Sequence, residues 1–202
     1  EFGSNLSPVA AAELWATKLW PYMNKNYPSV KLVSPGPSGD KAYISYLADF
    51  MGNLTTKTCG TQSCDKTVYA VAHHSCMQPL DGIADCTTGN CCNFKGTIGQ
   101  LEGSQWLPKG LPPVFDIAKK YNTKVWLTEL GCDSQNITEV TGYAAGLIDY
   151  LLTDPQASEL VERAYYCNNC TGVWSDSRLL PLFEHGTSNL SLVGKAWLRW
   201  LQ

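Results

Sequence analysis

The stretch VWLTELGCD, residues 125–133, is a short apolar run that ends in a carboxylate, a glycine and a cysteine. Val125, Trp126 and Leu127 are residue types that favour a buried β-strand, and Glu129 follows them at the end of that strand. Whether this carboxylate has a chemical task depends on what surrounds the strand. The neighbouring segments therefore decide both the fold and the meaning of Glu129.

Helical and strand-like patterns alternate along the rest of the chain. Ser7 can cap a helix that has Pro8 at its first position, and Asn26 and Pro28 end that helix. Further helices are expected at residues 40–52, 112–121, 138–152 and 192–201. Strands are expected at VKLVSP (30–35), TVYAVAHH (67–74), KVWLTE (124–129) and ERAYYC (162–167). Each expected strand thus follows an expected helix.

Four apolar strands that each follow a helix predict a parallel α/β architecture, because parallel strands need crossover connections and are buried on both faces. In such folds the loops after the strands carry the chemistry. The residues at these positions are Ser34, Pro35, His73, His74, Glu129, Tyr166 and Asn168. Glu129 is therefore expected at the carboxyl end of a buried strand, where a barrel enzyme carries its catalytic groups.

Length and composition narrow the function classes. With 202 residues, 44% hydrophobic side chains and a net charge of −3, residues 1–202 form one globular domain long enough to bury a sizeable core. The small net charge argues against a nucleic-acid binder. No stretch approaches the roughly 18 consecutive apolar residues of a membrane span. Any targeting peptide lies outside this sequence.

Cysteines and glycosylation sequons indicate the compartment. The chain has nine cysteines and five Asn-X-Ser/Thr sequons. The sequons begin at Asn5, Asn53, Asn136, Asn169 and Asn189. Disulfides persist and N-glycans are added along the secretory route, so the combination predicts a secreted glycoprotein, extracellular or associated with a cell wall or surface.

Two cysteine pairs lie close together in sequence. Cys59 and Cys64 are expected to form a disulfide, and Cys167 with Cys170 could close a second loop. Residues 75–109 are polar and rich in Gly and Cys, which predicts a long disulfide-linked loop. Sequence alone does not give the connectivity. A zinc site is not expected, because the cysteines that could complement Cys167 and Cys170 lack C-x-x-C spacing.

Several segments resemble, in order, the second half of the glycoside hydrolase family 128 catalytic core. They are NLSPVAAAELWATKLWPYM (5–23), KLVSPGPS (31–38), YISYLADFM (43–51), CGTQSCDKTVYAVAHH (59–74), KVWLTELG (124–131) and NLSLVGKAWLRW (189–200). That family consists of (β/α)₈ TIM barrels, and its members are endo-β-1,3-glucanases. The resemblance implies that this chain covers roughly strands 5–8, acts on β-1,3-glucan without a cofactor, and uses Glu129 as the nucleophile of a retaining mechanism.

The resemblance also implies a second catalytic carboxylate. Its acid/base Glu follows an Asn just before the NLSP helix, so it falls ahead of residue 1 or on Glu1. Residues 1–4 have the look of a cloning remnant; if they are native, Glu1 is the acid/base residue. Retaining glycosidases need two carboxyl groups roughly 5–5.5 Å apart, so Glu129 cannot act alone. Asp133 and Glu139 are expected to be solvated or capping residues.

Four other residues are expected to bind substrate. They are His73, His74, Tyr166 and Trp174. The family usually has His-aromatic-Tyr where this chain has His73, His74 and Ser75, so the Tyr that contacts the nucleophile is missing. One histidine can equally be a buried structural residue. Since side chains alternate along a strand, only one of Tyr165 and Tyr166 can face the cleft.

Half a barrel would leave two open sheet edges and an uncovered interior face. A partner is therefore expected, either the N-terminal half of the same protein or another subunit that completes the barrel. The sequence also allows a function of another class, namely a non-catalytic structural or glucan-binding glycoprotein subunit of an extracellular assembly. The extra cysteines and the missing Tyr after His74 favour this alternative, whereas Glu129 in its family context favours the enzyme.

Overall fold

The structure is a computed structural model that describes residues 6–36, 43–77, 111–132, 137–166 and 188–198. Several residues with predicted roles lie outside these ranges. They are Glu1, Asn5, Asp133, Asn136, Cys167, Asn168, Asn169, Cys170 and Trp174, together with residues 78–109 of the predicted cysteine-rich loop.

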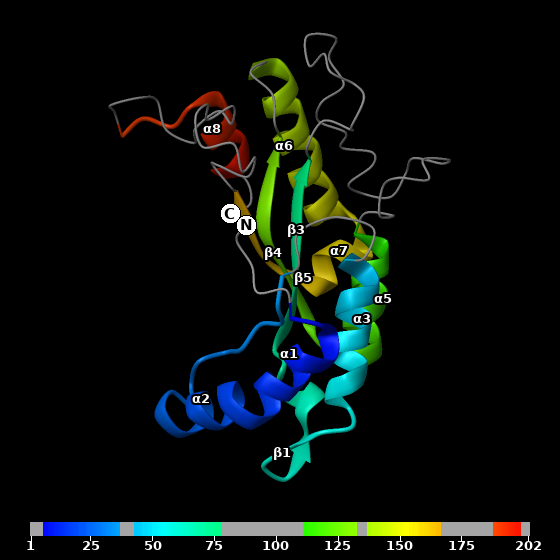
Figure 1. Cartoon of the computed structure of the whole chain (residues 1–202). Helices are drawn as coiled ribbons and strands as arrows, with labels where there is room; N and C mark the ends of the chain where they lie inside the picture. Colours follow the sequence, from blue (N-terminus) through cyan, green and yellow to red (C-terminus); the bar gives the residue numbers. More distant parts are fainter. Residues whose placement is uncertain (1–5, 37–42, 78–110, 133–136, 167–187, 199–202) are drawn as a thin grey trace.

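A parallel sheet forms the centre of the described part (Figure 1). Its strands are β3 (Ala70–Met77), β4 (Lys124–Cys132) and β5 (Val161–Tyr166), in the spatial order β3-β4-β5. Both neighbouring pairs are parallel. Val33 makes a further parallel bridge to Ala70. The four expected strand regions thus lie side by side in chain order, and the predicted parallel α/β architecture is confirmed.

Helices occupy the intervals between these strands. Their bounds are α1 (Pro8–Leu14), the π-helix η1 (Trp15–Leu19), α2 (Trp20–Asn26), α3 (Tyr43–Leu54), α5 (Pro112–Tyr121), α6 (Ile137–Thr153), α7 (Pro155–Leu160) and α8 (Leu192–Leu198). Helix α7 was not expected. It begins because Asp154 accepts hydrogen bonds from the backbone N–H groups of Gln156 and Ala157, at 3.0 and 2.8 Å.

The first helix follows its sequence signals closely. The Ser7 hydroxyl accepts a hydrogen bond from the backbone N–H of Ala10 at 3.2 Å, and Pro8 stands in the first turn. The rod formed by α1, η1 and α2 ends at Asn26, where Tyr27 leaves the helical conformation. What the sequence pattern did not reveal is the π-helical turn in the middle, which begins at the buried Trp15.

The region before β3 differs from its prediction. The sequence predicts one strand over residues 67–74, but the strand begins at Ala70. A short hairpin of β1 (Thr58–Cys59) and β2 (Gln62–Ser63) and the 3₁₀-helix η2 (Cys64–Thr67) precede it. The Thr67 hydroxyl donates to the carbonyl of Cys64 at 2.6 Å, which favours the helical turn over an extended strand.

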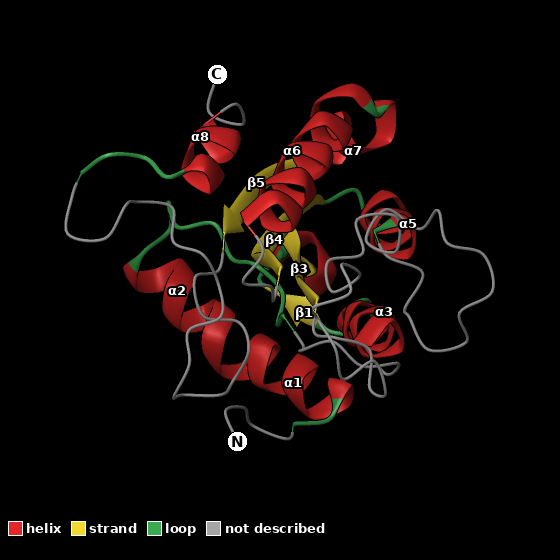
Figure 2. Cartoon of the chain, turned by 90° about the horizontal axis from the view of Figure 1, so that it is seen from above, coloured by secondary structure: helices red, strands yellow, loops and turns green. Residues whose placement is uncertain are grey.

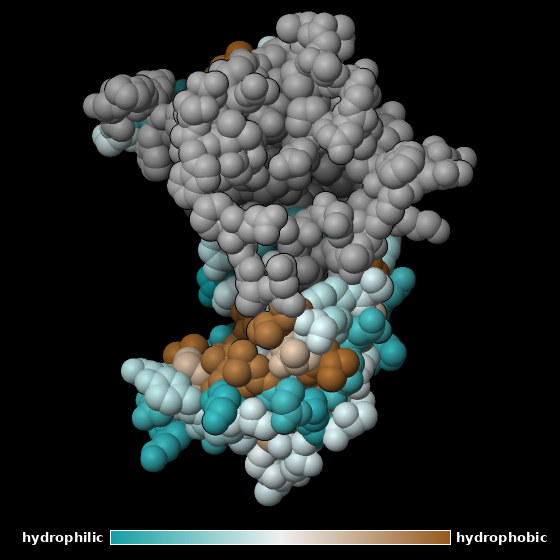
Figure 3. Space-filling view, in the orientation of Figure 1, coloured by the Kyte–Doolittle hydropathy of each residue, from teal (hydrophilic) through white to brown (hydrophobic). Residues whose placement is uncertain are grey.

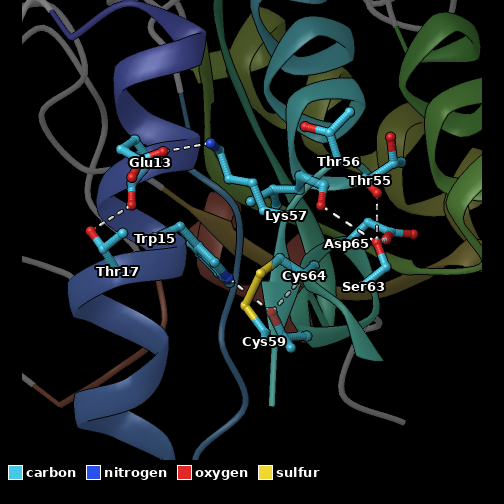
Figure 4. Close-up of a disulfide and its surroundings, with 12 residues drawn as sticks. Glu13, Trp15, Thr17, Thr55, Thr56, Lys57, Cys59, Ser63, Cys64 and Asp65 are labelled. Carbon is cyan, nitrogen blue, oxygen red and sulfur yellow. Dashed lines mark hydrogen bonds and ion pairs between the residues drawn. A yellow bond between two sulfur atoms is a disulfide. The ribbon is translucent and has the colours of Figure 1, made fainter. Parts of the chain in front are cut away.

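The predicted disulfide between Cys59 and Cys64 is present (Figure 4). Both cysteines are buried, at 1% and 0% exposure. Beside it, the Trp15 indole N–H donates to the Thr67 hydroxyl at 2.9 Å, and the Trp15 ring meets Phe50 edge-on at 5.7 Å. The disulfide, the hairpin and the N-terminal rod therefore form one packed corner.

The main core lies between the sheet and its helices. Figure 2 shows α3, α5 and α6 on one side of the sheet. Val71, Val125 and Leu127 point into the same hydrophobic cluster as fully buried side chains of these helices. Those helical residues are Leu47, Phe50, Met51, Leu54, Val114, Phe115, Leu147 and Ile148. In the described part of the chain, no helix has both the length and the apolar character that a membrane span needs.

Candidate functional site

The carboxyl ends of the three strands bring predicted site residues onto neighbouring strands. The backbone register pairs His74 of β3 with Glu129 of β4, and Leu130 of β4 with Tyr166 of β5. For Glu129 the structure describes the backbone only. The register therefore fixes its position, one strand away from His74 on β3 and one strand away from the end of β5 at Tyr166.

Irregular pairing occurs at the same place on β4. The register with β3 shifts between His73 and His74, so that Leu127 pairs with His73 while Glu129 pairs with His74. Thr128 falls between the two pairs, and its hydroxyl donates to the carbonyl of His73 at 3.3 Å. Bulges of this kind redirect side chains at sheet ends and occur beside active sites. The strand is thus irregular at the residue before Glu129.

The two histidines of β3 have different environments. His73 is only 4% exposed, whereas His74 is half-buried. Burial, with a smaller contribution from the nearby charge of His74, lowers the pKa of His73 to about 3. His73 is therefore neutral near pH 7 and fits the buried alternative that the sequence left open. A role of His74 in binding substrate stays a prediction.

The segment Ser34–Gly36 completes this end of the sheet beside His74. The Ser34 hydroxyl accepts a hydrogen bond from the backbone N–H of Ala72 at 2.9 Å and donates to the carbonyl of Pro35 at 3.0 Å. A Cβ placed on Gly36 would lie 2.5 Å from Nε2 of His74. The segment is therefore packed so closely against the imidazole that a side chain at residue 36 would require the His74 ring to move.

The two tyrosines at the end of β5 face different neighbours, as strand alternation predicts. Tyr166 packs against Trp197 of α8 with ring centroids 5.6 Å apart, and burial raises its pKa to about 12. Tyr165 is 44% exposed and lies 6.2 Å from the ring of Trp126. Sequence reasoning chose Tyr166 for substrate binding. The structure places that ring against a helix and leaves Tyr165 as the accessible one.

A network around Trp126 was not anticipated. The Glu162 carboxylate accepts hydrogen bonds from the Tyr69 hydroxyl and from the Trp126 indole N–H, the latter at 2.7 Å. Lys31 Nζ lies 3.5 Å from Glu162 and 3.8 Å from the centroid of the Tyr69 ring. The Arg163 guanidinium lies 5.2 Å from the Trp126 ring. The hydrogen bond from Tyr69 is the largest cause of the lowered pKa of Glu162.

This network fixes Trp126 three residues before Glu129 on the same strand, roughly 10 Å away along the backbone. No sequence signal identifies it, because Lys31, Tyr69 and Glu162 are far apart in the chain and no motif links them. It therefore helps to hold β4 in place.

The carboxyl ends of the strands, here called the rim, contain few carboxylates that could take part in catalysis. Among the described residues at the carboxyl ends of the strands (34–36, 73–77, 127–132 and 164–166), Glu129 is the only Asp or Glu. The described residues also include no group of three His, Cys, Asp or Glu placed to hold a metal ion. The described ends of the strands thus contain one carboxylate, whereas glycoside hydrolysis requires two.

Comparison with known proteins agrees with this description. The family model described as "Glycosyl hydrolase catalytic core" matches residues 1–88. A GH128 (subgroup VI) exo-β-1,3-glucanase from Aureobasidium namibiae has a similar structure, with a TM-score of 0.55 and 16% identity. An endo-β-1,4-glucanase from Xanthomonas axonopodis pv. citri gives a TM-score of 0.47 and 13% identity, covering 98% of this chain and 67% of that one. No curated protein matches the chain.

The family match confirms the resemblance to a glycoside hydrolase catalytic core, and the fold is similar to that of a GH128 enzyme. The A. namibiae structure matches 95% of this chain, while this chain spans 62% of that protein. At 16% identity the likeness shows the fold. The family match ends before β4, so the role of Glu129 rests on the WLTELG resemblance and on its place in the sheet.

Proposed function

We propose that this chain is part of the catalytic core of a secreted glycoside hydrolase that cleaves β-1,3-glucan with retention of configuration. The observation that carries the proposal is the place of Glu129, at the carboxyl end of a parallel strand and paired in register with His74. The family match over residues 1–88 and the glucanase-like fold support it.

Glu129 acts as the nucleophile in this proposal. Its carboxylate attacks the anomeric carbon, the bond to the leaving oxygen breaks, and a second carboxylic acid gives its proton to that oxygen. The resulting glycosyl ester is then hydrolysed by water, whose proton returns to the second carboxylate. The resemblance puts this acid/base residue at Glu1 or just ahead of it. His74, Tyr166 and Trp174 remain proposed contacts of the sugar.

A further part of the protein completes the barrel. On the face of the sheet that carries Trp126, Tyr165 is 44% exposed. The N-terminal rod also exposes Val9, Leu14 and Leu19 at 57%, 48% and 40%, and Figure 3 shows hydrophobic residues gathered in this region. Apolar surface of this kind marks an interface. The partner is the N-terminal half of the same protein or a subunit that supplies the remaining strands.

Secretion is part of the proposal as well. The buried Cys59–Cys64 disulfide is compatible with an oxidising compartment. Of the two sequon asparagines in the described residues, Asn189 is exposed, while Asn53 is half-buried and donates its amide to the carbonyl of Asp49 at 2.7 Å. Asn189 is therefore the more accessible acceptor for a glycan.

The test uses the complete protein and a soluble β-1,3-glucan of the laminarin type. Glu129→Gln keeps the shape of the side chain but cannot form the glycosyl ester, so we expect hydrolysis to fall by at least about 10⁴-fold. Glu159→Gln is the matched control, because Glu159 is exposed on α7, which directly precedes β5 and thus lies at the opposite end of that strand from Tyr166. Its hydrolysis rate should equal that of the unmutated protein.

Two results would contradict the proposal in different ways. If the Glu129→Gln protein still hydrolyses the glucan, Glu129 is not the nucleophile, although the protein is a glucanase. No hydrolysis by the unmutated complete protein would remove the activity itself. The configuration of the first product, followed by NMR, tests the retaining step separately.

A further inference from the structure

A pocket of about 240 Å³ lies at the amino end of the sheet, away from Glu129. Three aromatic residues line it. Trp20 comes from α2, Tyr27 follows the end of that helix, and Tyr69 directly precedes β3. Figure 1 shows α2 projecting beside this lower end of the sheet. The pocket therefore lies between the N-terminal rod and the start of the central strands.

The pocket is separate from the candidate catalytic rim. Tyr69 lies five residues before His74 along the chain, which corresponds to roughly 16 Å of extended strand. No residue of the rim lines the pocket. A ligand in the pocket would thus not contact Glu129, although a long polymer could reach both places.

The charges in the pocket favour a neutral ligand. Lys31 and Lys66 both line it, which at first suggests an anion. However, Lys31 Nζ lies 3.5 Å from the Glu162 carboxylate, and Lys66 Nζ lies 3.0 Å from that of Asp65. Both ammonium groups are therefore already compensated. A phosphate or uronate would have to compete with these carboxylates.

The uncharged groups in the pocket are those that suit a sugar. Asn24 is exposed on α2, and its amide offers a donor and an acceptor. Tyr27 is 50% exposed, so much of its ring is open to solvent. A hexose has apolar C–H faces that pack on aromatic rings and hydroxyls that bond to amides.

We propose that this pocket is an accessory carbohydrate-binding site that holds a neutral hexose unit of a glucan chain. Tyr27 and Trp20 contact the sugar face, and Asn24 bonds to its hydroxyls. The choice of a glucan rests on the proposed function, whereas the position of the pocket and its neutral balance do not. The site anchors a polymer and leaves the chemistry at the rim unchanged.

The experiment compares a polymer with a short substrate on the complete protein. In Tyr27→Ala and in Asn24→Ala, we expect the KM for laminarin to rise by about fivefold, the effect of losing one stacking or hydrogen-bonding contact. The kcat for laminarin and both constants for a laminari-oligosaccharide too short to span the two sites should not change. Binding of laminarin to the Glu129→Gln protein, measured by calorimetry, should weaken by the same factor.

Lys25→Ala is the control, because Lys25 is exposed on the same helix but does not line the pocket. An unchanged KM and affinity in the Tyr27 and Asn24 variants would overturn the proposal, as would an equal loss in Lys25→Ala. Tighter binding of polygalacturonate than of laminarin would assign the pocket to anions instead. If the complete protein binds laminarin without cleaving it, and Tyr27→Ala weakens that binding, the proposed hydrolysis fails while the accessory site stands.

Discussion

Gly36 and His74 are in such close contact that a side chain on the glycine would occupy the space of the imidazole. A Cβ at Gly36 would lie 2.5 Å from Nε2 and 3.0 Å from Cδ2 of His74, and 3.3 Å from Cβ of Ala72. The glycine comes from the segment after Val33, and the histidine is the first residue of β3 after its register shift. The contact therefore fixes His74 beside the strand position of Glu129.

Gly36→Ala should consequently displace the His74 ring without unfolding the protein. If His74 contacts the sugar, we expect kcat/KM of the complete protein on laminarin to fall by about tenfold or more, because small displacements at an active site have large kinetic effects. Circular dichroism should stay unchanged. An activity equal to that of the unmutated protein would mean that the position of His74 does not matter for turnover.

Gly142→Ala is the matched control for this substitution. A Cβ at Gly142 meets nothing within 4 Å, and the residue is exposed on α6. Alanine is the better helix former by about 0.5–1 kcal/mol, so this variant should be slightly more stable and equally active.

His73 predicts a pH dependence of stability. Its pKa is about 3 in the folded protein and near 6.5 when unfolded, so the unfolded chain binds the extra proton between these values. Stability should be fully present above pH 6.5 and should decrease as the pH falls through this window, by up to about 1.4 kcal/mol per pH unit. Urea unfolding of the protein at pH 7, 6, 5 and 4 measures this slope.

Two variants separate the contribution of His73 to the pH dependence of stability from that of the Asp and Glu side chains, which also titrate at low pH. His73→Gln should be less stable at pH 7 but should lose less stability between pH 6.5 and 4. His74→Gln should keep most of the slope, since burial is a larger cause of the His73 shift than the charge of His74. Equal slopes in the unmutated and His73→Gln proteins would contradict the buried, neutral assignment.

The Cys59–Cys64 disulfide should contribute measurably to stability. It closes a loop over a sequence separation of five residues, and restricting the unfolded chain to that extent contributes about 2 kcal/mol. The double variant Cys59→Ala, Cys64→Ala should lose at least this much free energy of unfolding, because both side chains are also buried. Guanidinium unfolding measures the difference.

Lys57→Met serves as the control in the same corner (Figure 4). Lys57 forms an ion pair with Glu13, whose side chain is 58% exposed, and surface pairs of this kind contribute less than about 1 kcal/mol. A loss in the double alanine variant no larger than in Lys57→Met would show that the disulfide adds little.

The proposed secretory origin predicts the oxidation state and the mass of the native protein. At least three disulfides should be present, so thiol titration of the denatured, unreduced chain should find at most three of the nine cysteines free. The intact mass should exceed that of the chain by glycans on several sequons, with Asn189 among them. A native protein with most thiols free and no added mass would contradict secretion.

Sequence patterns alone determined the alternation of helices and strands, because the spacing of apolar residues depends only on local geometry. The Ser7–Pro8 start of the first helix and the Cys59–Cys64 pair were predictable for the same reason, since their partners lie within a few residues. The short hairpin and η2 before β3 were missed. There the turn after Cys64 is stabilised by the hydrogen bond from the Thr67 hydroxyl to the Cys64 carbonyl. The residue types of TVYAVAHH favour a strand, so the sequence pattern did not indicate this turn.

What only the tertiary structure decided are relationships between residues far apart in the chain. The sequence offered His73 and His74 as equals, and packing buried the first and set the second against Gly36. It offered Tyr166 for the cleft, and in the folded chain that ring packs against Trp197 of α8, whereas Tyr165 lies exposed beside Trp126. A strand pattern states that neighbouring side chains point to opposite faces. Which face is covered depends on the helices that pack there, and that is fixed only when the whole chain has folded.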